Sequence, residues 1–504
     1  MEFHEKNGVA VNVKSSGEGS QSIDIGSVDI NFDIEKHPEE VSNGTILKKL
    51  DRTFMIPMLL VYTLQFLDKV VLNYAKVMGM ADDLKLVENQ FTDLPTYFFV
   101  AYIIAELFNG FYVLPKFPVA TVLSVNVCAW GLFTACCAAC TNYRGILTVR
   151  ILLGLAESVV IPAMVILSTN FYSKAEQAFR IGIWYSGLGF GQIFGGIISY
   201  LFQLVGPGAA VEGWRIMFIV IGLINIIVGV YIYFYIPSTP LSAKMLTAKE
   251  KFILLQKLTE SKIGVKTDLL NWKQIWELVT DIQAWLLFLV CATISFSSNT
   301  ISTFSATDII SFGFDSKEAA LLNMPSGVVS ILSSCLSTYF IMKGFTRYLA
   351  ICILLLPAVT GGALMSFLPK SNQAGLLIGI YMINTVTAPL AICYSWAGAN
   401  FAGSLKKIGI NAIFISCGFA LANIVSPKLY NFKDAPNYYP AKISMLATQA
   451  GSIFICLLIA FIYYLRNKQR DREQDGKVID ENEEVENVWL DLTDHQNRSF
   501  RYCY

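Results

Sequence analysis

Five ionisable residues stand inside long apolar stretches of this chain, where such residues are uncommon. They are Asp68, Lys69, Glu106, Arg150 and Glu157. A charged group at the depth of a lipid bilayer costs about 3 kcal/mol or more, and such residues usually serve an ion or substrate pathway. The alternative is that Asp68 with Lys69, or Arg150 with Glu157, only neutralise each other as packing pairs.

The spacing of Arg150 and Glu157 favours the pathway reading. They are seven positions apart, so in a helix they share a face and lie about 10 Å apart along the axis, too far for the usual one-turn pair. A guanidinium can bind a carboxylate through two parallel hydrogen bonds, and a buried carboxylate can take a proton. Because an anion beside Arg150 would change the proton affinity of Glu157, the pair predicts coupled transport of a proton and an anion.

Asp68 and Lys69 are neighbours in sequence and lie about 100° apart around a helix, so they do not face the same point. We expect Asp68 to face a cavity as a second proton-binding or gating acid. Lys69 is expected to bind substrate or to bridge to the stretch of Arg150, and the sequence leaves open which of the two faces the cavity.

The second half of the chain has almost no ionisable residue in its apolar stretches but many polar ones. The substrate-binding candidates there, added to Lys69 and Arg150, are Asn299, Tyr381, Asn384, Tyr394, Trp396 and Asn400. Hydrogen bonding between helices is the alternative for each of them. The three histidines, His4, His37 and His495, fall in the polar tails, so we expect no catalytic set, metal site or cofactor, and no enzyme.

The composition indicates that these stretches cross a membrane. The hydrophobic fraction is 54%, the charged fraction is 15% and the mean hydropathy is +0.52, whereas soluble domains carry about 25% charged residues. Lysine plus arginine equals aspartate plus glutamate at 38 each, so nothing indicates a nucleic acid partner. The partner is the lipid bilayer.

Twelve stretches are long enough to cross, since a span needs about 20 apolar residues. Six begin near Phe54, Phe91, Val119, Ile146, Ile181 and Ile216, and six near Ala284, Ala319, Leu349, Ala374, Ile408 and Ile443. This predicts an all-α polytopic membrane protein with a disordered tail (1–49), a six-helix bundle (50–236), a basic linker (237–283), a second six-helix bundle (284–466) and a C-terminal tail (467–504). Two six-helix halves are typical of transporters built from parallel repeats.

Lysine and arginine in the short loops predict the orientation. Lys48, Lys49 and Arg52, the linker and Arg466 with Lys468 fall on one side if the spans alternate, so both termini are expected in the cytoplasm. Three lysines on the other side, Lys428, Lys433 and Lys442, weaken this reading for the last hairpin.

Several segments together resemble the fungal allantoate permease family. They are Leu67-Asp68-Lys69, the run from Arg150 to Glu157, Asn323-Met324-Pro325-Ser326-Gly327, Ala399-Asn400 leading to Lys406, Asp434-Ala435-Pro436, and the tail from Asp491 to Asn497 ending in Phe500-Arg501-Tyr502. The resemblance implies the major facilitator fold and proton-coupled uptake of organic anions such as allantoate, nicotinate or other carboxylates. Carried over by motif, proton coupling falls on Asp68 and Glu157, and anion binding on Arg150. Two departures, in the loop 110–118 and at Ile236-Pro237-Ser238, put gating contacts of other branches in doubt.

We therefore expect a monomeric, proton-coupled importer of a small organic anion in the plasma membrane, with an endomembrane as the alternative. The other functions left open are import of a sulfur-containing acid or short peptide, and a nutrient sensor without transport. The acidic segment from Asp480 to Glu486 is the feature that a sensor would use to bind partners.

Overall fold

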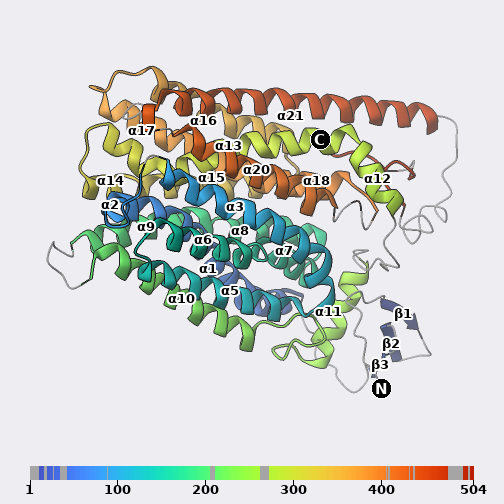
Figure 1. Ribbon diagram of the computed structural model, residues 1–504. Coiled ribbons are helices and arrows are strands. Elements are labelled where there is room, and N and C mark those ends of the chain that lie inside the picture. Colours follow the sequence, from blue (N-terminus) through green and yellow to red (C-terminus); the bar gives the residue numbers. More distant parts are fainter. Residues whose placement is uncertain are drawn as a thin grey trace.

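The computed structural model describes residues 11–15, 20–25, 28–33, 43–87, 89–204, 211–260, 272–403, 406, 409–430, 432–434, 438–474, 492–497 and 500–504. The acidic segment 480–486 and linker residues 261–271 lie outside this description. The described chain is a long bundle of roughly parallel and antiparallel helices (Figure 1).

The N-terminal half holds all five ionisable residues selected from the sequence. Its helices are α1 (Asn43–Val77), α2 (Met80–Asp83), α3 (Gln90–Phe108), η2 (Asn109–Val113), α4 (Leu114–Lys116), α5 (Val119–Cys136), η3 (Cys137–Ala139), α6 (Tyr143–Glu157), α7 (Val160–Phe171), α8 (Lys174–Tyr185), α9 (Gly187–Gln203) and α10 (Gly213–Tyr235). Two of the predicted spans are each divided in two, into α6 with α7 and α8 with α9.

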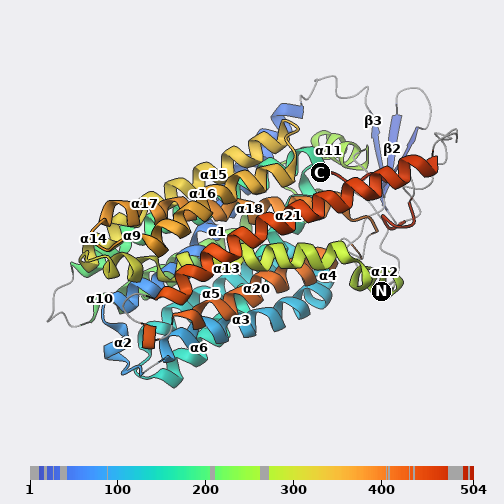
Figure 2. The ribbon, with the colours of Figure 1, turned by 90° about the horizontal axis from the view of Figure 1, so that it is seen from above.

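The C-terminal half follows two linker helices, α11 (Ala248–Glu260) and α12 (Trp272–Thr280). Its helices are α13 (Ile282–Ser311), α14 (Ser316–Leu322), α15 (Met324–Met342), α16 (Arg347–Phe367), α17 (Gln373–Ile383), η4 (Asn384–Val386), α18 (Thr387–Asn400), η5 (Ile410–Ile415), α20 (Ser416–Val425), η6 (Ser426–Leu429), η7 (Phe432–Asp434) and α21 (Tyr439–Gln474). The linker helices and the C-terminal tail lie at one end of the bundle, which we call the linker side. The end that carries α2 and α14 is the opposite side (Figures 1 and 2).

The described helices include eleven that are long and apolar enough to cross a membrane. The twelfth expected span, from near Ile408, corresponds to η5 and α20 across Ile410–Val425, where a π-helical segment precedes a short α-helix. Because α20 packs against α13 and α3, this segment still takes its place in the bundle. The prediction of an all-α polytopic fold is confirmed.

The described part of the N-terminal tail contains a small sheet. Three short strands, β1 (Val11–Ser15), β2 (Ser20–Ile25) and β3 (Val28–Asp33), pair antiparallel in the order β1-β2-β3. The first long helix also begins at Asn43, ahead of the apolar stretch that marked it in the sequence.

Glycines let α9 pack closely against both halves. A Cβ at Gly191 would lie 2.7 Å from the carbonyl oxygen of Thr63 in α1, and a Cβ at Gly196 would lie 2.6 Å from that of Ala320 in α14. A Cβ at Gly189 would collide with the carbonyl oxygen of Gly327 in α15. The dense glycines of this span therefore serve close helix packing, including packing between the halves.

The two linker helices bind different halves. In α11, Glu250 pairs with Lys49 at 2.7 Å and Lys257 pairs with Glu176 at 2.6 Å, which ties this helix to the N-terminal half. In α12, Glu277 pairs with Lys406 of the C-terminal half at 2.8 Å. The linker therefore divides between the halves it joins.

Candidate functional site

The centre of the N-terminal half contains an ion pair between two predicted site residues. Nη1 of Arg150 in α6 lies 3.0 Å from Oδ2 of Asp68 in α1, and the side chains are only 2% and 1% exposed. Thr134 donates a hydrogen bond to Oδ1 of Asp68 at 3.2 Å. The pair crosses two helices, so it is neither of the packing pairs considered from the sequence.

Arg150 has hydrogen-bonding capacity to spare. Its Nε and Nη2 have no partner among the described residues, and its guanidinium lies 5.4 Å from the ring centroid of Phe218. Unpaired donors on a buried guanidinium are costly unless something binds them. One edge of the guanidinium is therefore left with two donors that no described residue satisfies.

Glu157 ends α6 and is fully buried. Neither of its oxygens has a hydrogen-bond partner among the described residues. Gln65 lies beside it without hydrogen-bond geometry, and Lys69 interacts with it electrostatically. A buried carboxylate without donors is poorly stabilised as an anion, which suits a group that binds and releases a proton.

Lys69 lies at the contact between the halves. Its Nζ is 5.3 Å from the ring centroid of Phe99 in α3 and 5.1 Å from that of Phe419 in α20. A cation between two aromatic faces is stabilised by both rings. Lys69 also interacts electrostatically with Asp68 and Glu157, so it links the acidic centre to the C-terminal half.

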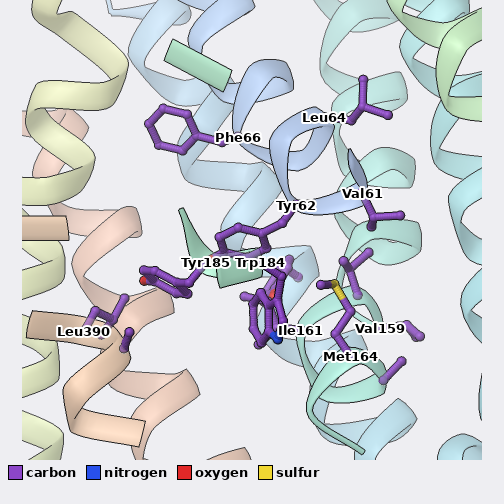
Figure 3. Close-up of a cluster of buried hydrophobic side chains, with 14 of the residues drawn as sticks. Val61, Tyr62, Leu64, Phe66, Val159, Ile161, Met164, Trp184, Tyr185 and Leu390 are labelled. Atoms are coloured by element: carbon purple, nitrogen blue, oxygen red, sulfur yellow. The ribbon is translucent and has the colours of Figure 1, made fainter. Parts of the chain in front are cut away.

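Four tyrosines lie near Glu106 and Glu157, and sequence reasoning selected only one of them, Tyr394. Tyr394 of α18 interacts with Tyr62, Tyr102, Tyr185 and Glu106 of the N-terminal half. The rings of Tyr62 and Tyr185 are 5.0 Å apart, and Figure 3 shows them side by side, near Leu390 of α18. The signal that could have identified the other tyrosines in the sequence is a polar hydroxyl group within an apolar stretch.

Three of the candidates in the second half are bonded within their own half. Asn299 donates to Oγ of Ser426 at 2.7 Å and also accepts from Thr303. Tyr381 donates to the carbonyl oxygen of Leu322 at 2.8 Å, and Asn384 to that of Ile380 at 2.8 Å. These bonds fit the alternative of helix stabilisation, and a substrate role for these residues stays a prediction.

Trp396 and Asn400 contact the C-terminal tail. Nε1 of Trp396 and Nδ2 of Asn400 each donate to the carbonyl oxygen of Cys503 at 3.0 Å, and the backbone N–H of Cys503 donates to Oδ1 of Asn400 at 2.6 Å. The structure thus brings together Asp68, Lys69, Arg150 and Glu157, and it places Tyr394 beside Glu106, while Trp396 and Asn400 hold the tail.

The tail is held by a second buried charge cluster, which we call the tail anchor: Glu277, Asp281, Lys406, Asp494 and His495. Nζ of Lys406, fully buried, lies 2.8 Å from Glu277, 3.2 Å from Asp281 and 2.8 Å from Asp494. Nε2 of His495 lies 3.1 Å from Asp281. The ammonium of Lys406 lies against both aspartates, so this side chain supplies the positive charge that balances the carboxylates, as a metal ion would.

Burial alone would raise the pKa of Asp281, but its hydrogen bond with His495 and the charges of Arg466 and Lys406 hold it well below its usual range. The same contacts act on Lys406 in the opposite sense. Burial would lower its pKa, but Asp494, Glu277 and Asp281 raise it. Both groups are therefore held in their charged forms.

On the opposite side, hydrogen bonds join the halves. Thr307 of α13 donates to Oδ1 of Asn73 in α1 at 3.0 Å. Asn323, just before α15, donates to the hydroxyl of Tyr74 at 3.0 Å and accepts from Gln192 of α9 at 3.2 Å. The structure is thus closed on this side, and the charged centre lies in the N-terminal half with Lys69 at the contact with the C-terminal half.

Two bundles of membrane-spanning helices with a buried charged centre are the arrangement of a secondary transporter, and the comparisons agree. Residues 58–406 match the model of the Major Facilitator Superfamily. The structure of the proton:xylose symporter XylE aligns with a TM-score of 0.65 over 81% of this chain and 96% of that one, at 12% identity.

Two curated relatives identify the branch. The thiamine pathway transporter THI73 of Saccharomyces cerevisiae is 35% identical over 91% of this chain and 86% of its own. The allantoate permease of the same yeast is 30% identical over 93% of this chain and 88% of its own. The chain belongs to the major facilitator superfamily, in the fungal transporter family of the allantoate permease type, and is not an enzyme.

Proposed function

We propose that the protein imports a small organic anion together with a proton by alternating access. The observation that carries the proposal is the buried centre in which Arg150 has unpaired donors and Glu157 has no hydrogen-bond partner. A site of this kind can bind one carboxylate and one proton next to each other.

The chemistry follows from competition for Arg150. An incoming carboxylate binds the free edge of the guanidinium and weakens its bond to Asp68. The negative charges of the substrate and of Asp68 then lie near Glu157 and favour the protonated form of Glu157. Anion and proton therefore stabilise each other in the site, which is the thermodynamic basis of coupling.

Lys69 connects this chemistry to the movement of the halves. Its ammonium is shared between the acidic centre and the rings of Phe99 and Phe419. Protonation of Glu157 removes one attraction on Lys69 and leaves it freer to follow Phe419 of the C-terminal half. The coupling therefore has a physical link across the interface.

For the substrate, we propose a carboxylate or vitamin-like acid such as allantoate or nicotinate. One curated relative is named as an allantoate permease and the other as a thiamine pathway transporter. The tyrosines beside Glu106 offer hydroxyl groups and ring faces to a polar, flat molecule. A sulfur-containing acid or short peptide is the second substrate class.

We place the protein in the plasma membrane as a monomer. The linker side is placed in the cytoplasm because it carries the basic linker, and lysine and arginine are in excess on the cytoplasmic side of membrane proteins.

Uptake of labelled carboxylates tests the proposal. Cells without their own permeases would be given allantoate, nicotinate or pantothenate at an external pH of about 5 or about 7, with and without a protonophore. One compound should enter faster in acid, and the protonophore should abolish its accumulation. No uptake of any compound despite surface expression would contradict this proposal and favour a sensor.

A further inference from the structure

A buried carboxylate in the C-terminal half has no part in the centre described above. Asp308 lies near the end of α13 on the opposite side and is fully buried. The sequence predicts almost no charge within the membrane in this half. Asp308 is not selected because α13 has 30 residues and extends beyond the stretch of about 20 apolar residues that marks a span.

The surroundings of Asp308 leave it half satisfied. Tyr430 donates a hydrogen bond to Oδ2 at 2.8 Å, while Oδ1 has no partner among the described residues. Tyr438 and Lys442 also face it. Nζ of Lys442 lies 5.1 Å from the ring centroid of Phe312 and makes no ion pair with Asp308 within 4.0 Å.

The position of Asp308 connects it to the closure between the halves. The preceding residue, Thr307, makes the hydrogen bond to Asn73 that joins α13 to α1. The ring of Tyr430 stacks on Phe304, one turn earlier in α13, with centroids 3.9 Å apart. The contacts of Asp308 are therefore built into the segment that closes the opposite side.

We propose that Asp308 is a further proton-binding residue, reached from the opposite side, and that its protonation favours closure there. This rests on the proposed proton-coupled function. In the closed arrangement a charged Asp308 is buried without full compensation, which is costly, whereas a neutral carboxyl is far easier to bury. A proton taken up from the external solution thus prepares the protein to close behind its substrate.

The test measures closure directly and needs no substrate. Spin labels at Val87 before α3 and Leu321 in α14, which are 59% and 42% exposed, report the distance between the halves on the opposite side. In a background without reactive cysteines, the purified full-length protein would be measured between about pH 5 and about pH 8. The wild-type protein should shift toward the short, closed distance in acid.

Asp308→Asn should remain at the short distance across the whole pH range, because the amide cannot be charged. Tyr430→Phe removes a donor to the ionised carboxylate, so its transition should occur at higher pH than in the wild type. Glu318→Gln, an exposed acid in α14, is the matched control and should follow the wild type.

The proposal is overturned if the wild type shows no transition, if Asp308→Asn follows the wild-type transition, or if Tyr430→Phe leaves its midpoint unchanged. An Asp308→Asn protein that is merely misfolded would not reproduce the closed distance of the acidic wild type. A pH-dependent closure without any uptake would contradict the proposed function alone. Proton-coupled uptake with an unaltered Asp308→Asn transition would contradict this inference alone.

Discussion

Nη1 of Arg150 lies 3.0 Å from Oδ2 of Asp68, and both side chains are almost wholly buried. The pair joins α1 to α6 and holds the guanidinium in place while Nε and Nη2 remain without partners. In the mechanism that we propose, the guanidinium is therefore oriented before an anion arrives. Asp68 then both orients Arg150 and competes with the substrate for it.

The first prediction concerns the shape of the cation. Arg150→Lys keeps the charge but loses the planar fork that can contact Asp68 and a carboxylate at once. We expect the ratio kcat/KM for uptake to fall about tenfold or more, a loss of roughly 1.4 kcal/mol or more. Initial rates over a substrate series, corrected for surface expression, provide the measurement. Arg144→Lys, an exposed position in the same helix, is the control, and equal kinetics in both variants would rule out two-point binding.

The second prediction concerns coupling. Glu157→Gln cannot bind or release a proton, so accumulation against a gradient should be lost while exchange of internal for external substrate continues. Counterflow and net uptake measured on the same cells separate the two activities. Uphill uptake by Glu157→Gln would show that another group carries the proton.

The third prediction concerns the contact between α9 and α15. Gly189→Val places a branched side chain against the carbonyl oxygen of Gly327, so the halves cannot approach as they do here. We expect uptake to fall to a small fraction of the wild-type rate in protein that still reaches the membrane. Gly398→Val is the matched control, because no atom lies within 4 Å of a Cβ added there. Equal loss in both variants would mean that the effect is not specific to this contact.

The fourth prediction concerns Lys406. Lys406→Met removes the cation from three carboxylates of the tail anchor and leaves buried negative charge, which costs about 3–5 kcal/mol in comparable sites. The Tm of the detergent-purified protein should fall markedly, and the tail should become sensitive to protease. Lys343→Met, at an exposed position, should change neither. A tail that stays protected in Lys406→Met would show that hydrogen bonds such as those of Cys503 suffice to hold it.

The fold and the residues of the charged centre could be predicted from the sequence, because the length of an apolar stretch and the ionisable residues within that stretch are local signals. Which group pairs with which is not a local property. Asp68 and Arg150 are 82 positions apart, and only the packing of α1 on α6 brings them together.

The same limit explains Trp396 and Asn400, whose polar groups in an apolar stretch suggested a substrate site. Their partner, Cys503, is more than a hundred residues away in a polar tail that no hydrophobic pattern places. The short π-helical start of the segment at Ile410 is likewise a backbone feature that a hydropathy window does not register.

The last prediction is the pH dependence of the tail anchor through Asp281. Its pKa is held below the usual range by His495, Arg466 and Lys406, so its ionised form stabilises the folded state. For a lowered pKa, this contribution is complete above the ordinary aspartate value of about 3.9 and is lost as pH falls below it. The difference in Tm between the wild type and Asp281→Asn should therefore shrink as pH falls below about pH 4. Asp471→Asn, in an exposed ion pair with Arg501, should match the wild type throughout, because exposed pairs contribute little. A Tm difference for Asp281→Asn that grows in acid would have the opposite sign. It would show that the ionised form of Asp281 does not stabilise the tail anchor.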